Sequence, residues 1–186
     1  MDKREVFVKT YYLNEHNKKQ NRIVCESLRE ALIILMNEKN YYKISICELC
    51  EKAGVSRMAF YNNYKSKDDL LRQIIYFQTI ILIDIVGSPF REKTDTNWYI
   101  KMFECIKDNN IYLKTIFNAN FKLEYLSAIN DLVLHDTDIN ATNKYLRLML
   151  TGGVDNTIIY WIESDMKDSI KEMAEFCYHN LSVWTK

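Results

Sequence analysis

The shortage of chain-breaking residues constrains this sequence most. Its 186 residues include four glycines and one proline. Because tight turns between strands depend on these residues, the chain has too few of them for a sheet of many short strands. Apolar side chains make up 48% of the sequence, which is ample for a core. An all-α fold is therefore expected.

Apolar residues recur at helical spacing along most of the chain, which predicts a series of amphipathic helices. They are expected near residues 17–36, 57–64, 96–108, 111–118, 120–135, 141–163 and 166–184. Two more lie between Ser45 and Gly54 and between Ser66 and the Gly87-Ser88-Pro89 stop. The expected organisation is an N-terminal arm over 1–16, a three-helix unit over 17–66 and a helical body over 67–186.

The segment ICELCEKAGVSRMAFYNNYKSKDDLL, which starts at Ile46, carries the most specific pattern. Ser45 and Glu48 stand at the spacing of a capping box, and Gly54 is suited to close a helix through positive φ. Ser56 and Ser66 are good caps for the two helices that follow. Helix, glycine turn and helix make a helix-turn-helix, whose second helix can enter the major groove of DNA.

Side chains of that second helix divide into two faces. Phe60, Tyr64 and either Met58 or Ala59 are expected to point inward. The outward side chains are expected to be Arg57, Tyr61, Asn62 and Asn63. Arginine can contact phosphate or guanine, and asparagine can pair with adenine. The alternative is an ordinary helical hairpin whose polar residues face water, and the formal net charge of zero gives no hint of a nucleic-acid partner.

The segment from Ala53 to Leu70 resembles the signature of TetR-type transcriptional regulators, and the resemblance covers about residues 17–72. It implies an N-terminal three-helix helix-turn-helix DNA-binding domain followed by a helical ligand-binding and dimerisation domain. Two departures concern Ala59, where the family often has threonine, and Asn62-Asn63, where it often has Tyr-His. The implied phosphate contacts are Ser45, Ser56, Tyr61 and Lys67, and the residues implied to face bases or their edges are Arg57, Met58, Ala59, Asn62 and Asn63.

Residues 144–184 show a fainter resemblance to the last two helices of TetR-type proteins, which pair with those of a second subunit. The resemblance implies a homodimer on a palindromic double-stranded DNA operator. Glycines 152 and 153 inside a helical run suggest a close helix approach, with a bend or break as the alternative. The expected interface residues are Gly152, Gly153, Ile158, Trp161, Ile170, Met173, Cys177 and Leu181.

The middle helices are rich in aromatic residues. The family resemblance implies a cavity for a small hydrophobic or aromatic effector, while an ordinary aromatic core remains the alternative. The expected lining residues are Trp98, Phe103, Tyr112, Phe117, Phe121, Tyr125, Tyr145 and Met149. Because repression is the common mode of the family, a ligand-responsive repressor is expected, with a coactivator or adaptor controlled by a protein partner as the alternative.

Other functions have weaker patterns. Cys47 and Cys50 form a C-x-x-C motif, but no second pair of ligands stands at a zinc-binding spacing. No phosphate loop or nucleophile motif is present, so neither an enzyme nor a cofactor is expected. Five scattered cysteines without a secretory signal suggest a cytoplasmic protein. The longest apolar stretch, residues 74–87, is too short and too often interrupted to span a membrane.

Overall fold

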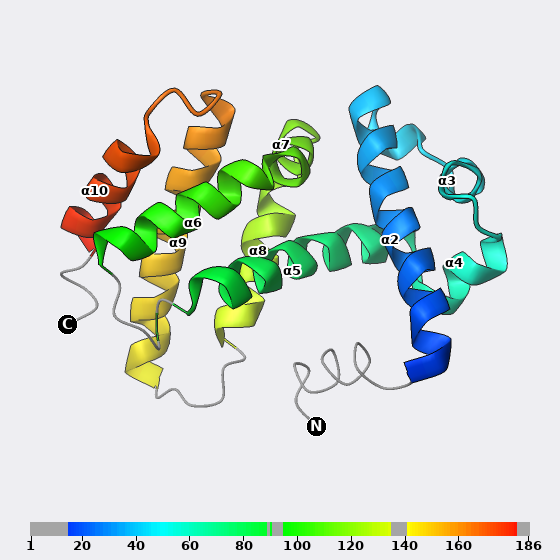
Figure 1. Ribbon diagram of the computed structural model, residues 1–186, viewed down its shortest axis with the longest axis horizontal. Helices are drawn as coiled ribbons and strands as arrows, with labels where there is room; N and C mark the ends of the chain where they lie inside the picture. The colour runs from blue at the N-terminus through cyan, green and yellow to red at the C-terminus, as the bar shows by residue number, and fades with distance from the viewer. Residues whose placement is uncertain (1–14, 89, 91–94, 135–140, 182–186) are drawn as a thin grey trace. The chain divides into compact units, whose positions relative to one another are not determined.

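The computed structural model describes residues 15–88, 90, 95–134 and 141–181 (Figure 1). For residues 15–20 and 141–143 it describes the backbone alone. Within these ranges the chain is helical and contains no strand, which confirms the expected all-α fold. The chain divides into two compact units, Met1–Ile74 and Ile75–Lys186, and the expected domain boundary after residue 66 stays a prediction. The predicted arm over 1–16 lies almost wholly outside the described residues. None of the helices in the described ranges is long and apolar enough to cross a membrane.

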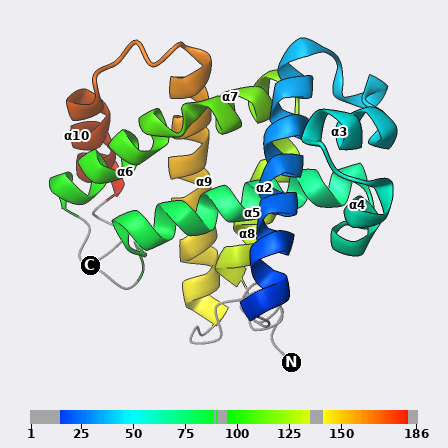
Figure 2. The same cartoon turned by 45° about the vertical axis from the view of Figure 1, so that its right-hand side comes forward.

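The first unit contains α2 (Glu15–Glu38), the short 3-10 helix η1 (Tyr41–Lys43), α3 (Ile46–Ala53), α4 (Arg57–Asn63) and the start of α5 (Lys67–Val86). Helix α2 packs against α3 and α4, which also contact each other (Figure 2). Side chains from all four α-helices are fully buried in this unit: Leu28, Leu32, Leu49, Phe60, Leu70 and Ile74.

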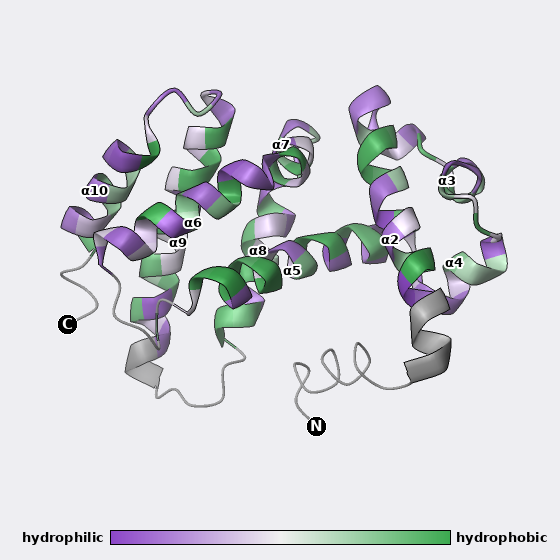
Figure 3. Ribbon diagram, in the orientation of Figure 1, coloured by the Kyte–Doolittle hydropathy of each residue, from purple (hydrophilic) through white to green (hydrophobic). Residues whose placement is uncertain are grey.

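The second unit contains the rest of α5 and α6 (Thr96–Asp108), α7 (Asn110–Asn118), α8 (Lys122–Leu134), α9 (Ala141–Glu163) and α10 (Ile170–Leu181). Helix α10 packs along α6, and both α7 and α8 pack against α9 (Figure 1). Hydrophobic and hydrophilic residues alternate around most helices, whereas α5 is largely hydrophobic (Figure 3). This pattern places the apolar faces of the helices in the core of the unit.

Helix α9 runs without interruption through both of its glycines, so the alternative of a break at that pair is wrong. A Cβ added at Gly152 would meet no atom within 4 Å, and one added at Gly153 would lie 3.7 Å from Leu181 Cδ2. Packing within the described chain therefore gives no reason for a glycine at Gly152, although each helical glycine costs about 1 kcal/mol relative to alanine.

Candidate nucleic-acid interface

Local hydrogen bonds fix the helix-turn-helix. The Ser45 hydroxyl accepts the Glu48 amide at 3.2 Å and caps α3, and the Ser56 hydroxyl accepts the Ala59 amide at 3.1 Å and caps α4. Gly54 ends α3 with a φ of 66°, a left-handed conformation in which side chains are strained. These three predictions are confirmed, and together they set the angle at which α4 leaves the turn.

Helix α4 has one buried and one exposed face. Phe60 and Tyr64 are buried, and burial raises the pKa of the Tyr64 phenol. Ala59 is half-buried, whereas Met58 is 75% exposed. Of the two residues that the sequence offered for the inward position, Ala59 is therefore the one that occupies it. The exposed side chains of the helix are Arg57, Met58, Tyr61 and Asn62.

Asn63 differs from the expectation of an outward side chain. It is half-buried, its Oδ1 accepts the Cys25 thiol of α2 at 3.3 Å, and its Nδ2 donates to the Ala59 carbonyl at 2.8 Å. The prediction that Asn63 faces outward is therefore wrong. The last turn of α4 rotates this position toward α2, and the amide links the two helices.

Lys67 is held inside the first unit. Its ammonium donates to the carbonyl oxygens of Tyr41 and Ile44, each at 2.7 Å, and lies 4.2 Å from the centre of the Tyr41 ring. The Tyr41 hydroxyl donates in turn to Asp68 Oδ1 at 2.5 Å. Burial lowers the pKa of the Lys67 ammonium. We call these four residues, Tyr41, Ile44, Lys67 and Asp68, the Lys67 clamp, which joins the first turn of α5 to η1.

The clamp holds the turn between α2 and α3, where the chain forms η1. The Asn40 side chain accepts the Tyr42 amide at 2.9 Å and caps η1. Tyr42 and Lys43 are exposed beside the N-terminus of α3, where Ser45 is exposed too. An asparagine followed by a Tyr-Tyr-Lys run was the available signal, because asparagine often caps a short helix.

The exposed serines retain the chemistry needed for a phosphate contact. Each of Ser45 and Ser56 accepts a backbone amide through a lone pair, which leaves its hydroxyl proton to donate. The contacts assigned to Ser45, Ser56, Arg57, Tyr61 and Asn62 stay predictions. Their shared exposure is the condition that such contacts require.

The expected dimer-interface residues fall into two groups. Ile158, Trp161 and Cys177 are at most 2% exposed, so their side chains belong to the core of one chain and not to its surface. The Trp161 ring meets Phe103 edge-on at 5.1 Å between centroids, and its Nε1 donates to the Asp168 carbonyl at 2.9 Å. The apolar stripe of α10 is used against α6 of the same chain. The remaining expected residues are at least partly accessible: Gly152, Gly153, Ile170, Met173 and Leu181.

The expected effector pocket is also different from what the structure contains. Tyr145 and Met149 are 74% and 60% exposed, so they do not line a cavity in this chain. Phe103, Phe117 and Phe121 are buried in the core. Trp98 and Tyr112 are half-buried, and Tyr125 lines the small cavity that is described below. Three of the expected aromatic residues therefore pack in the core of this chain, and the effector pocket stays a prediction.

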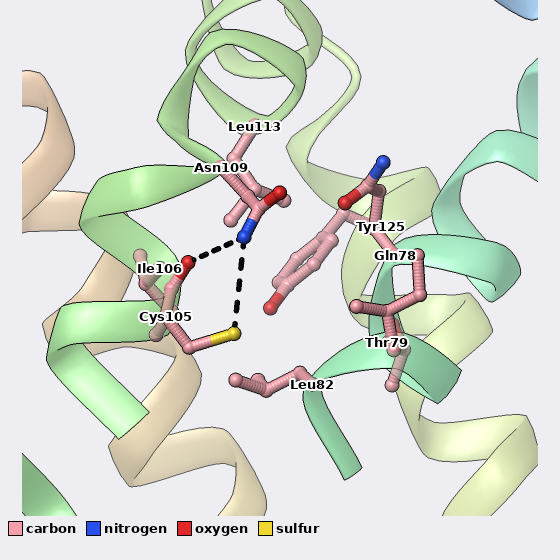
Figure 4. Close-up of a pocket in the computed structure, with 9 residues that line it drawn as sticks. Gln78, Thr79, Leu82, Cys105, Ile106, Asn109, Leu113 and Tyr125 are labelled. Carbon is pink, nitrogen blue, oxygen red and sulfur yellow. Dashed lines mark hydrogen bonds between the residues drawn. The ribbon is translucent and has the colours of Figure 1, made fainter. Parts of the chain in front are cut away.

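A small cavity of about 30 Å³ lies among α5, α6, α7 and α8 (Figure 4). This volume suits one or two water molecules. The Asn109 amide donates to the Cys105 carbonyl at 2.9 Å along one wall, and the Tyr125 hydroxyl points into the space between Cys105 and Leu82. The lining residues are Gln78, Thr79, Ile81, Leu82, Cys105, Ile106, Asn109, Leu113 and Tyr125.

The C-x-x-C motif is divided between two environments. Cys47 is exposed and Cys50 is buried, and burial raises the pKa of the Cys50 thiol. Among the residues that the structure describes, no three His, Cys, Asp or Glu side chains are grouped as metal ligands. The position of Cys50 in the core of the first unit identifies it as a packing residue.

Comparisons with known proteins agree with this geometry. Residues 28–74 match the family model described as bacterial regulatory proteins, tetR family, and residues 94–182 match that of a transcriptional regulator C-terminal region. The Transposon Tn10 TetC protein of Escherichia coli is 38% identical over 179 residues, which cover 93% of this chain and 86% of that protein. The HTH-type transcriptional activator FasR of Mycolicibacterium smegmatis is 23% identical, over 89% of this chain and 88% of its own.

Solved structures share the fold. A TetR transcriptional regulator from Streptococcus agalactiae has a TM-score of 0.58 at 18% identity, with 89% of this chain and 97% of the other covered. The regulator FadR from Bacillus subtilis, solved in complex with stearoyl-CoA, has a TM-score of 0.54 at 15% identity, with 84% and 96% covered. Together with the identity to TetC, these matches show that the chain belongs to the TetR family of bacterial regulatory proteins and is a DNA-binding transcriptional regulator.

Proposed function

We propose that the protein is a homodimeric, ligand-responsive repressor that binds a palindromic operator through α4. The presentation of α4 carries this proposal. Its inner face is anchored by Phe60 and Tyr64, while Arg57, Tyr61 and Asn62 are exposed on the opposite side. An anchored helix with an exposed polar face can enter the major groove without losing its packing.

The exposed residues divide into base-reading and backbone-binding groups. Arg57 and Asn62 carry the bidentate groups that recognise guanine and adenine edges. Ser45, Ser56 and Tyr61 supply hydroxyls for phosphate oxygens, which position the protein without reading sequence. Lys43 adds a positive charge on η1 near Ser45. Lys67 acts differently, because its ammonium holds η1 in place through the Lys67 clamp.

A second copy of the chain would cover the open face of α9 and α10. Four large side chains there are more than half exposed in the single chain: Tyr145, Met149, Tyr160 and Phe176. Positions 145, 149, 152, 156 and 160 recur at helical spacing, so the two tyrosines, Met149 and the unhindered Gly152 share one face of α9. A glycine in such a face permits a partner helix to approach closely. Two copies of α4 about 34–36 Å apart would read successive major grooves.

Repression would follow from occlusion of a promoter by the bound dimer. An effector would relieve it by binding better to a conformation whose two α4 helices no longer match both half-sites. FadR of Bacillus subtilis, a structural neighbour, was solved with stearoyl-CoA, which supports effector control in proteins of this fold.

The alternative is a coactivator or adaptor that responds to a protein partner. The small size of the cavity, about 30 Å³, and the exposed aromatics of α9 and α10 favour it. Under this alternative, a variant with Phe176 or Tyr160 changed would remain dimeric and lose the partner. Under the proposed function, the same variant would lose dimerisation.

The test is selection from a randomised DNA duplex, followed by titration of the selected duplex at several salt concentrations. We expect a palindrome with two half-sites and a steep fall of affinity with salt. Arg57→Ala should relax the selected sequence at one position of each half-site, while Lys101→Ala, which changes an exposed lysine of α6, should leave it unchanged. Unselective binding by the wild-type protein would refute the base-reading role of α4.

A further inference from the structure

Asn63 is the last residue of α4, and its side chain is held from two sides. Its Nδ2 donates to the Ala59 carbonyl at 2.8 Å, one turn earlier in the same helix. Because a carbonyl can only accept, the amide atom that is left to face α2 is the oxygen, Oδ1. This oxygen accepts the Cys25 thiol at 3.3 Å. A continuous chain of hydrogen bonds therefore runs from α2 through Asn63 to the backbone of α4.

The Cys25 thiol also lies beside Tyr64, the residue that follows α4. Burial is the largest cause that raises the pKa of the Tyr64 phenol, and the neighbouring thiol raises it further. The guanidinium of Arg29, one turn along α2 from Cys25, opposes that rise. Cys25 is therefore the point on α2 at which both side chains at the end of α4 meet.

The middle of α4 is held by packing without a preferred direction. Phe60 is fully buried, but burial of an apolar ring is non-directional, whereas a hydrogen bond requires a certain distance and angle. Helix α4 has seven residues, so it can rotate about its axis unless a directional contact prevents it. Since a helix is about 10–12 Å across with its side chains, a rotation of about 20° moves a side-chain tip by about 2 Å. A hydrogen bond to a base edge does not survive such a shift.

From this geometry we infer that Asn63 is a positioning residue for DNA recognition, which sets the rotation of α4 through its hydrogen bond with Cys25 and does not itself contact DNA. The inference rests on the proposed function, because it concerns how α4 presents Arg57 and Asn62 to base edges. Both of those side chains are exposed, one at the start of the helix and one beside Asn63. Cys25 then contributes to sequence selectivity from α2, without a contact to the operator.

The bond between Cys25 and Asn63 should matter more for selectivity than for stability. A thiol is a weak hydrogen-bond donor, and both residues are half-buried, so water can replace either partner when the other is removed. The orientation of α4, in contrast, affects each base contact that the helix makes. Loss of one such contact lowers the affinity for the operator by about fivefold or more.

The test compares two duplexes of equal length, the selected operator and a scrambled sequence. Both are titrated with the wild type, Cys25→Ala, Asn63→Ala and the double variant. Each single change should lower affinity for the operator about fivefold to tenfold and leave affinity for the scrambled duplex unchanged. The double variant should lose no more than a single one, because both changes break the same bond. The urea midpoint of each variant should stay near that of the wild type, whereas a merely structural role would lower it.

A conservative variant and a matched control complete the design. Cys25→Ser keeps a donor at the same position, so it should restore the affinity for the operator that Cys25→Ala loses. Asn37 makes the same local bond within α2, from its Nδ2 to the Ile33 carbonyl at 3.0 Å. Asn37→Ala should therefore leave the affinities for both duplexes unchanged.

The contrary outcomes are distinct from one another. If Asn63 reads DNA directly, Asn63→Ala will lose affinity for the operator while Cys25→Ala behaves as the wild type, and the inference is overturned. Equal losses on both duplexes with a lowered urea midpoint, or no recovery in Cys25→Ser, would overturn it as well. Unselective binding by the wild type defeats the proposed function, whereas a selective wild type together with an equally selective Cys25→Ala defeats the inference alone.

Discussion

Replacement of Lys67 by methionine tests whether this lysine positions the interface or touches DNA. Methionine keeps the length and the apolar stem of the side chain but removes the ammonium. Its loss leaves the carbonyls of Tyr41 and Ile44 without their 2.7 Å donors. Hydrogen bonds from a charged donor contribute about 1.5–3 kcal/mol each. Relief of the partly buried charge offsets some of this, so we expect a loss of about 2–4 kcal/mol in unfolding free energy.

Two measurements separate the roles. Urea unfolding followed by circular dichroism reports the stability of the clamp, and titration of operator DNA over a range of salt reports the number of phosphate contacts. If Lys67 only positions η1, affinity falls while the slope of log affinity against log salt stays the same. A phosphate contact would lower the magnitude of that slope by about 0.9.

The control is Lys101→Met, at an exposed position of α6, which should change neither measurement. The positioning role is refuted if Lys67→Met keeps the wild-type urea midpoint and loses about one unit of salt slope. In that case the Lys67 ammonium would break its hydrogen bonds to the Tyr41 and Ile44 carbonyls when DNA binds. The phosphate contact that the family resemblance implies would then be correct.

Three further predictions concern other parts of the molecule. Lys43→Ala should lower the salt slope by about 0.9 with little effect on stability, in salt titrations of operator binding, because Lys43 is exposed. Phe176→Asp should shift sedimentation toward a monomer, while Glu175→Asp at the exposed neighbouring position should not. The carboxyl of Asp155 has a pKa of about 7 in the folded protein against an ordinary 3.8, so its contribution to stability is greatest at acid pH and falls as pH rises to about 7. Asp155→Asn should remove this fall, which amounts to about 4 kcal/mol at most, in unfolding measured from pH 4 to pH 8.

Features that depend on neighbouring residues in sequence were predictable. Ser45, Gly54 and Ser56 fix the ends of α3 and α4 through bonds that span three or four residues, so the residue types alone identify them. The periodicity that predicted helices near 57–64 and 141–163 is equally local, and the observed helices are Arg57–Asn63 and Ala141–Glu163. Local chemistry was therefore sufficient for the architecture of the recognition unit.

Partners distant in sequence were not predictable. An apolar stripe on α10 fits a second subunit as well as it fits α6, and only the folded chain shows that Cys177 is used internally. Asn63 looked like a surface residue because its partner, Cys25, lies 38 positions away on α2. The aromatic content of the sequence could not locate the cavity, because large rings such as Phe103 and Phe117 fill the core. The cavity lies instead beside smaller side chains, such as Thr79, Cys105 and Asn109.

Lys67 and Asp155 show how a charge inside a folded chain can be interpreted. Lys67 is half-buried and Asp155 is buried, and for both desolvation is the largest cause of the pKa shift. The ammonium of Lys67 meets two carbonyls and an aromatic ring, so its desolvation is offset within the chain and its role is architectural. The carboxyl of Asp155 meets one phenol and keeps a buried oxygen without a donor. The cost of burying this carboxyl is therefore not offset within the described part of the chain, whereas the cost of burying the Lys67 ammonium is.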